Sequence, residues 1–223
     1  MPHARRYLAG WLLAVAAMVG YALLWLGYRH SWGWLATVDS AALRGCLAAA
    51  TALPGWVGWW NGVCTVFAPV VFRLLAMIVA GVALYRRRLR AALFVLVSVE
   101  FSGLVSQGAK DLADRPRPST ALVTAASSSF PSGHALGVVV GVAALLTVGW
   151  PVWNRRARVA AGAVGALLVV MVGFGRVALN VHHPSDVLAG FALGYSYWWL
   201  CAQLLFATLG RSRAATGPAV TGR

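Results

Sequence analysis

The sequence predicts an all-α membrane protein with six transmembrane helices. Three observations support this prediction: the chain is 60% hydrophobic and only 11% charged, long apolar runs recur along it, and its cations gather in short clusters between those runs. This composition lies well outside that of soluble domains. The net charge of +14 does not indicate a nucleic-acid partner, because nucleic-acid binders concentrate their cations on one face or groove.

Six apolar runs, each about 18 to 23 residues long, can cross a bilayer. The predicted spans lie near residues 8–28, 63–85, 89–109, 133–150, 159–179 and 187–209. They form one transmembrane domain over residues 1–210, and a short basic cytoplasmic tail follows at 211–223. The first run resembles a signal peptide, but its apolar core is too long and no small-residue cleavage site follows, so we interpret it as a retained span.

Arginine placement predicts the orientation, because short positively charged loops stay in the cytoplasm. One side of the six-span arrangement carries the arginine clusters at residues 5–6, 86–90, 155–158 and 211–213. The other side has isolated cations: Arg29, Arg44, Lys110, Arg115, Arg117 and Arg176. We therefore expect a multi-pass protein of the cell membrane with both termini in the cytoplasm.

A tryptophan-rich segment of about 30 residues separates the first two spans. Its middle has a helix-favouring composition behind a possible cap at Asp39 or Ser40, which predicts an interfacial helix on the outer face. A plain loop explains the composition equally well. Cys46 and Cys64 could form a disulfide if both face an oxidising compartment, but three cysteines do not define a disulfide framework.

Two charges fall inside predicted spans, Arg73 in the second and Glu100 in the third. Charges inside a membrane are costly and usually pair. At 1.5 Å per residue, both lie roughly 17 Å from the cytoplasmic ends of neighbouring antiparallel helices. This depth predicts a structural ion pair, and a role in a proton path is the alternative.

Three polar clusters stand at the outer ends of spans three to six. Their members are Lys110 with Arg117 and Pro118, then Ser132, Gly133 and His134, then Arg176, His182 and Asp186. All three emerge on the same membrane face and can meet there. Three cations brought together in a partly desolvated place would repel one another, so they predict an anionic ligand. The helix that opens at Gly133 adds free backbone N–H groups for that anion.

The two histidines extend this prediction from binding to catalysis. A neutral imidazole can attack phosphorus if a carboxylate holds its other ring N–H, and a second histidine can protonate the leaving oxygen. Arginine gives forked donors to phosphate oxygens and Lys110 adds a point charge. The set predicts an active site for phosphoryl transfer at the extracytoplasmic ends of helices three to six.

The same residues resemble the three-part signature of the type 2 phosphatidic acid phosphatase superfamily. The resemblance covers residues 110–186, about a third of the chain, and the six-span layout matches the integral membrane members. It implies a metal-independent lipid phosphatase without a cofactor. By this resemblance His182 is the nucleophile that forms phosphohistidine, Asp186 its orienting partner and His134 the acid for the leaving group. The phosphate-binding residues it implies are Lys110, Arg117, Ser132, Gly133 and Arg176.

Three residues depart from the signature or stand outside it. Gly175 replaces the serine that often precedes the arginine of the third motif, which removes one hydroxyl donor. His183 lies three residues before Asp186, whereas His182 lies four before it, so we interpret His183 as a packing residue or a contact behind the nucleophile. Arg115 could meet a second phosphate of a diphosphate substrate, but we interpret it as a solvated loop cation.

The resemblance implies a lipid phosphate or diphosphate as substrate and membrane lipids as partners, without a nucleic acid. A polyprenyl diphosphate such as undecaprenyl diphosphate is the first choice, and phosphatidylglycerol phosphate or phosphatidic acid is the alternative. Vanadate-dependent haloperoxidases share the signature, but they are larger soluble oxidoreductases. A non-enzymatic anion-binding membrane protein would not need His182 four residues before Asp186 beside a second histidine. The sequence does not indicate an oligomeric state.

Overall fold

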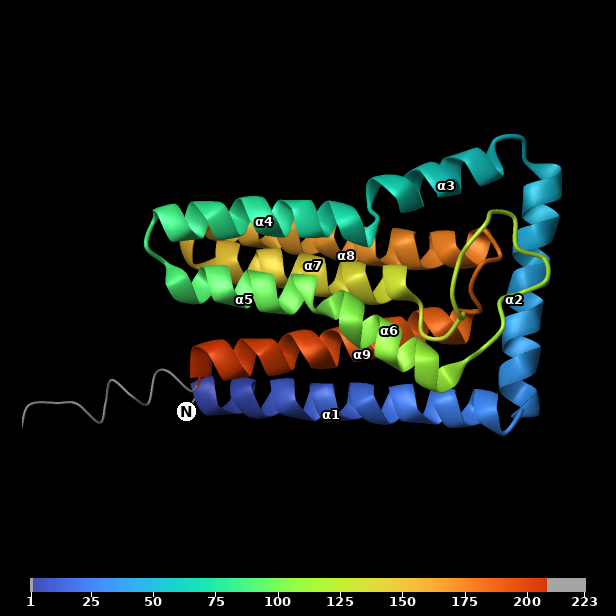
Figure 1. Cartoon of the computed structure of the whole chain (residues 1–223), viewed down its shortest axis with the longest axis horizontal. Coiled ribbons are helices and arrows are strands. Elements are labelled where there is room, and N and C mark those ends of the chain that lie inside the picture. Colours follow the sequence, from blue (N-terminus) through green and yellow to red (C-terminus); the bar gives the residue numbers. More distant parts are fainter. Residues whose placement is uncertain (1, 208–223) are drawn as a thin grey trace, which may run out of the picture.

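The protein is seen here in a computed structural model that describes residues 2–207, and all regular structure in this range is helical (Figure 1). The predicted tail at 211–223 lies outside the described residues. The helices are α1 (Pro2–Arg29), α2 (Gly33–Ala52), α3 (Trp56–Val66), α4 (Pro69–Tyr85), α5 (Leu89–Glu100), α6 (Ser102–Ala113), α7 (Gly133–Gly149), α8 (Arg155–Ala178) and α9 (Pro184–Ala202). Short 3₁₀ and π segments, η1 (Trp150–Val152) and η2 (Gln203–Ala207), follow α7 and α9.

Within residues 2–207, five helical stretches are long and apolar enough to cross a membrane. They are Tyr7–Arg29, Trp56–Tyr85, Leu89–Ala113, Gly133–Val152 and Arg155–Ala178, and each overlaps one of the first five predicted spans. The sixth predicted span coincides with α9 and η2. Helix α9 packs against α1 and α7. It is not among the five stretches, because its serine, tyrosine and tryptophan residues make it less apolar than those stretches.

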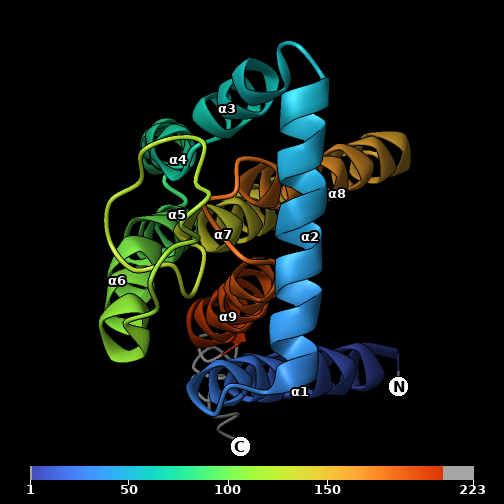
Figure 2. The same ribbon diagram turned by 90° about the vertical axis from the view of Figure 1, so that its right-hand side faces the viewer.

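The second and third predicted spans are each broken into two helices. Phe67 and Ala68 interrupt the chain just before Pro69, which takes the first turn of α4, where a missing N–H is harmless. The break lets α3 tilt away from α4 and pack on α8 (Figure 2). A second break at Phe101 separates α5 from α6.

The segment between the first two spans is a helix and not a loop. The 20-residue α2 runs across one end of the bundle, opposite the turn that joins α4 to α5 (Figures 1 and 2). The predicted cap at Asp39 or Ser40 is wrong, because α2 begins at Gly33 and both residues lie inside it. Asp39 is instead 2% exposed and accepts a hydrogen bond from the backbone N–H of Ser185 over 3.0 Å.

The predicted ion pair between Arg73 and Glu100 is wrong. Helices α4 and α5 do pack together, but no salt bridge joins the two side chains in the described part of the chain. The Arg73 guanidinium instead lies against α6, where a Cβ built on Gly103 would fall 2.0 Å from Nη2. The break at Phe101 explains the error. Glu100 is the last residue of α5, whereas the Arg73 guanidinium extends beyond the end of α5 and contacts Gly103 of α6.

Helices α7 and α9 pack closely at the end of the bundle that α2 crosses. A Cβ on Gly190 would lie 2.6 Å from the carbonyl oxygen of Ser132, so only glycine permits this approach. The backbone N–H of Ser132 donates to the carbonyl oxygen of Asp186 over 2.9 Å. These contacts fix the start of α7 against the start of α9, and therefore the second polar cluster against the third.

Candidate active site

The three polar clusters meet in one hollow of about 300 Å³ at the end of the bundle that α2 crosses. Its wall comes from the end of α6, the start of α7, the end of α8, the turn before α9 and a face of α3. The lining residues are Asn61, Lys110, Arg117, Val123, Thr124, Ala125, Ala126, Ser127, Gly133, His134, Arg176 and His182. The sequence therefore predicted the convergence correctly.

Among the residues that the structure describes, three cations line this hollow and no carboxylate does. Lys110 and Arg176 are buried near the ends of α6 and α8, and Lys110 donates to the carbonyl oxygen of Ser128. The Nε of Arg176 has no hydrogen-bond partner among the residues that the structure describes. A buried donor without a partner is costly, so the hollow is suited to an anion that accepts from Arg176.

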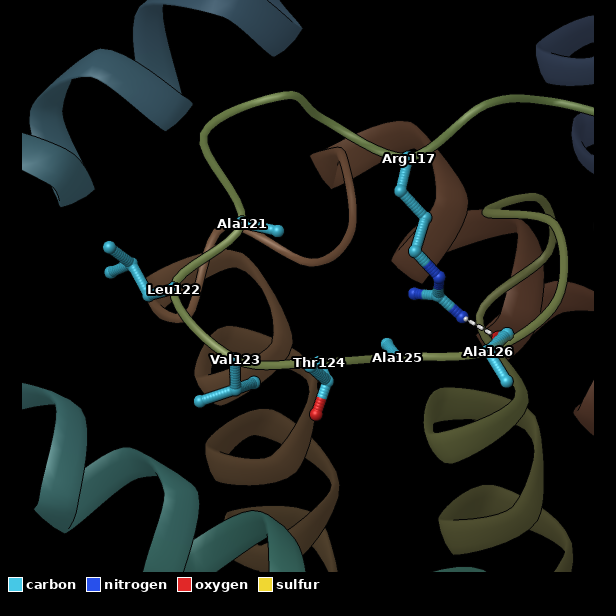
Figure 3. A pocket seen from close by; sticks show the side chains of 7 residues that line it. All are labelled: Arg117, Ala121, Leu122, Val123, Thr124, Ala125 and Ala126. Atoms are coloured by element: carbon cyan, nitrogen blue, oxygen red, sulfur yellow. Dashed lines mark hydrogen bonds between the residues drawn. The ribbon is translucent and has the colours of Figure 1, made fainter.

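Arg117 lies on the loop 114–132, which connects α6 to α7 and folds back over the hollow. Its guanidinium donates to the backbone carbonyls of Ser127, Ala126 and Val181 over 3.1, 2.8 and 2.8 Å. Figure 3 shows the side chain reaching from one arm of the loop to Ala126 on the other, at the edge of a wider opening of about 810 Å³. Arg117 is therefore held in place by the backbone before any ligand binds.

His182 occupies the centre of the site and is 1% exposed. Its Nδ1 lies 3.4 Å from Ser129 Oγ and 3.6 Å from Asp186 Oδ2, and its Nε2 lies 3.2 Å from an Arg117 nitrogen. Arginine only donates and carboxylate only accepts, so these neighbours assign the proton to Nδ1 and the lone pair to Nε2. Burial lowers the pKa of His182 to about 4, which keeps the ring neutral at neutral pH.

The start of α7 supplies the second histidine. His134 is half-buried and lines the hollow beside Gly133. A Cβ on Gly133 would fall 3.1 Å from Ser106 Oγ, so the glycine allows the start of α7 to pack closely against α6. Ser132 lies behind the wall, fully buried, and its hydroxyl accepts from the Ala135 N–H as the cap of α7. Of the predicted phosphate-binding residues, Ser132 alone is not in the lining of the hollow.

A family model described as the PAP2 superfamily matches residues 91–209, slightly more than half of the chain. The chain belongs to the PAP2 superfamily. Residues 91–209 include all three polar clusters and the loop 114–132, so this match covers every residue of the predicted site.

Named proteins and a solved structure of the PAP2 type are also similar to this chain. It is 34% identical over 131 residues to phosphatidylglycerophosphatase B of Bacillus subtilis, over 57% of this chain and 64% of that protein. It is 38% identical over 76 residues to undecaprenyl-diphosphatase of Sulfolobus acidocaldarius, over 34% of this chain and 33% of that protein. The chain thus spans less than two thirds of the length of either relative.

The similar structure is the crystal structure of the first transmembrane PAP2 type phosphatidylglycerolphosphate phosphatase from Bacillus subtilis. It matches with a TM-score of 0.75 and 25% sequence identity, over 86% of this chain and 94% of that one. The arrangement of the helices is therefore that of a transmembrane PAP2 protein.

The glycine that departs from the PAP2 signature has a local explanation. A Cβ on Gly175 would lie 2.8 Å from Cys64 Sγ and 3.2 Å from the Trp60 ring. Helix α3 packs on α8 at this point, and Trp56 Nε1 donates to the carbonyl oxygen of Ala178 over 3.0 Å. The space that a serine would need is thus filled by α3. Cys64 and Cys46 are free thiols, on α3 and α2.

Arg115 is not a solvated cation, and this sequence interpretation is wrong. The residue is 8% exposed and forms ion pairs with Asp39 over 2.9 Å and with Asp186 over 2.6 Å. His183 caps α9, and its Nδ1 lies 3.2 Å from Asp186 Oδ2, so it contacts the carboxylate beside His182 and does not line the hollow.

Sequence reasoning missed three residues of this PAP2 site. Ser129 contacts His182, Asp39 pairs with Arg115, and Asn61 lines the hollow from α3. The run of three serines that ends at Ser129, directly before the second motif, is a signal that could have found the first of these. For Asp39 and Asn61 the sequence holds no comparable signal, since both lie on helices far from the motifs.

Proposed function

We propose that this chain is a membrane lipid phosphatase that hydrolyses a lipid phosphate or diphosphate through a phosphohistidine on His182. The observation that supports this most is the neutral His182 ring in the wall of a hollow lined by three cations, one of which, Arg117, lies 3.2 Å from its Nε2. The match to the PAP2 superfamily and the names of two similar proteins support the same conclusion.

The reaction proceeds in two steps. In the first, His182 Nε2 attacks phosphorus, the bond to the lipid oxygen breaks, and His134 gives that oxygen its proton. Asp186, with Ser129 between, stabilises the positive charge that develops on the ring. In the second step, His134 takes a proton from water, the water oxygen bonds to phosphorus, and the P–N bond breaks. Inorganic phosphate leaves and Nε2 regains its lone pair.

Lys110, Arg117 and Arg176 hold the phosphoryl oxygens during both steps. In the transition state the charge spreads over three equatorial oxygens, and these three cations reach the hollow from three different elements. No step in this sequence uses a metal ion, so EDTA should leave the activity unchanged.

Phosphatidylglycerol phosphate is the substrate that the comparisons favour, ahead of the polyprenyl diphosphate expected from the sequence. The longer match and the similar structure both carry that lipid in their names, whereas the shorter match is named undecaprenyl-diphosphatase. Purified protein with EDTA should release phosphate from one of these lipids, and kcat/KM over phosphatidylglycerol phosphate, prenyl diphosphate and phosphatidic acid identifies it.

Trapping tests the proposed intermediate. Acid-labile, base-stable phosphate should appear on the wild-type protein and be absent from His182→Ala. Phosphate that persists on the His182→Ala protein would assign the nucleophile elsewhere. Release of phosphate that depends completely on a divalent metal would overturn the histidine mechanism.

The proposal includes α9 as a sixth span and places the site on the extracytoplasmic side of the cell membrane, with both termini in the cytoplasm. The arginines at 86–88 and 155–158 support this orientation, since the first group lies in the turn between α4 and α5 and the second at the start of α8, whereas the hollow is lined by the end of α8. In intact cells a membrane-impermeant maleimide should label Ser119→Cys, and should label Arg155→Cys only after permeabilisation. The reverse pattern would invert the orientation.

A further inference from the structure

Arg115 and Asp39 lie outside the three motifs, yet they form the most extensive buried polar contacts behind the site. One Arg115 nitrogen donates to Asp186 Oδ1 over 2.6 Å and to Ser185 Oγ over 2.7 Å. The other donates to Asp39 Oδ2 over 2.9 Å. Asp39 also accepts from the hydroxyl of Ser185 over 2.6 Å. These contacts join α2, the loop 114–132 and the start of α9.

The backbone of Arg115 holds the other group that touches the nucleophile. Its carbonyl oxygen accepts from the Ser129 N–H over 2.7 Å, and Ser129 Oγ donates to Asp186 Oδ2. Ser129 and Asp186 are the two groups nearest to Nδ1 of His182. A single residue therefore fixes both, one through its side chain and one through its backbone.

The charges in this group explain why two carboxylates are present. Arg115 alone beside Asp186 would neutralise the carboxylate that must stabilise a cationic ring on His182. Asp39 supplies a second negative charge for Arg115, so Arg115, Asp39 and Asp186 together carry one net negative charge. Since all three are less than 9% exposed, this charge is only weakly screened.

We infer that Arg115 and Asp39 are positioning residues that hold Asp186 in place and keep its negative charge available to His182 when the ring takes the phosphoryl group. The inference rests on the proposed function, because it concerns the step that forms the phosphohistidine. It assigns a catalytic purpose to the crossing helix α2, whose Asp39 lies 147 positions before Asp186 in the chain.

The decisive variant is Asp39→Asn, which keeps the shape of the side chain and removes its charge. Rapid-quench trapping of labelled phosphoprotein gives the rate constant of phosphoryl transfer from the time course and the competent fraction from the amplitude. We expect the rate constant to fall about 10- to 100-fold, with KM changed less than about twofold. This is the loss of activity that follows when a group that orients a metal-ligating side chain is removed, and Asp39 would orient Asp186 in a similar way. The matched control is Asp111→Asn, because Asp111 is an exposed carboxylate on α6 that accepts a hydrogen bond from Gln107.

A purely structural role predicts another result, namely a lower amplitude with an unchanged rate constant, and this would overturn the inference. If Asp39→Asn leaves Arg115 too costly to bury and the protein does not fold, Asp39→Asn with Arg115→Gln removes both charges together. That double variant keeps one net negative charge on Asp186 but loses the contacts that hold it in place, so it should fold and transfer phosphate more slowly than wild type, and a wild-type rate constant would refute the positioning role. If wild-type protein traps no phosphate, the proposed function itself fails.

Discussion

Substitution of Gly190 by alanine tests the packing that brings the second and third polar clusters together. The added Cβ would lie 2.6 Å from the Ser132 carbonyl oxygen and 2.9 Å from Ala135 Cβ, whereas ordinary contacts begin at 3.4 Å. The two helices must therefore separate by about 0.8 Å at this point, since the first obstacle is backbone. The upper end of the usual cost of such overpacking is about 3 kcal/mol in the free energy of unfolding. The higher helix propensity of alanine recovers about 1 kcal/mol of this cost.

The net loss of about 2 kcal/mol should lower the apparent melting temperature by about 4 to 8 °C for a domain of this size. Activity should fall as well, because the start of α7 carries His134 and moves away from His182. Displacements near 1 Å cost up to about 100-fold, so we expect kcat/KM to fall at least about tenfold. Thermal unfolding in detergent and phosphate release from the lipid substrate measure the two effects.

The matched control is Gly162→Ala in α8, where an added Cβ meets nothing within 4 Å. This variant should melt within about 2 °C of wild type or slightly above it, with unchanged kcat/KM. If Gly190→Ala behaves like Gly162→Ala in both measurements, the close approach of α7 and α9 does not set the geometry of the site, and the reasoning is wrong.

Three further predictions concern separate parts of the molecule. Gly175→Ser should lower stability by about 1 to 3 kcal/mol and Cys64→Ala in the same chain should recover most of the loss, whereas additive losses would contradict the clash at Sγ. Arg73→Leu and Glu100→Leu should add within about 0.5 kcal/mol in a double-mutant cycle of unfolding, because no ion pair joins them; a coupling above about 1 kcal/mol would show that they pair. The pKa of His182 is lowered to about 4 in the folded protein. Below pH 6.5 the unfolded chain therefore binds a proton on this histidine that the folded protein does not bind. The free energy of unfolding should thus fall by about 2 kcal/mol between pH 8 and pH 5. The His182→Asn variant should lose this part of the pH dependence of the melting temperature, and an identical dependence in both proteins would contradict the assignment.

The sequence was sufficient to predict the elements whose signals are local. Apolar runs reveal the spans, and the offsets that join Arg176, His182 and Asp186 select His182, which lines the hollow where His183 does not, because both signals depend on residues close together in the chain. The break before Pro69 also had a local signal, since proline favours a helix start, but the long apolar run outweighed it. The break at Phe101 had no such signal.

Contacts between distant segments were not predictable in the same way. The pair of Asp39 with Arg115 joins positions 76 apart, and neither residue type is distinctive on its own. An isolated cation in an outer loop usually meets water, so the sequence favoured a solvated interpretation for Arg115, whereas Asp39 was interpreted as a possible helix cap. The incorrect prediction of an ion pair between Arg73 and Glu100 has a related origin. The distance of a residue from the end of an ideal helix gives its depth in the membrane, but it does not give the direction of a long side chain.

In the proposed reaction, the charges around His182 would separate attraction for the ligand from support for the nucleophile. Asp39 and Asp186 are directed toward Arg115 and His182, and neither is among the residues that line the hollow with the three cations. The guanidinium of Arg117 is already held by three backbone carbonyls, while Arg176 keeps a donor without a partner. Donors that are fixed before the ligand arrives need no reorganisation as charge develops, which is the condition for strong electrostatic stabilisation of a transition state. A dianionic phosphate would therefore meet a site whose positive charge is already oriented, with the balancing carboxylates kept behind the attacking ring.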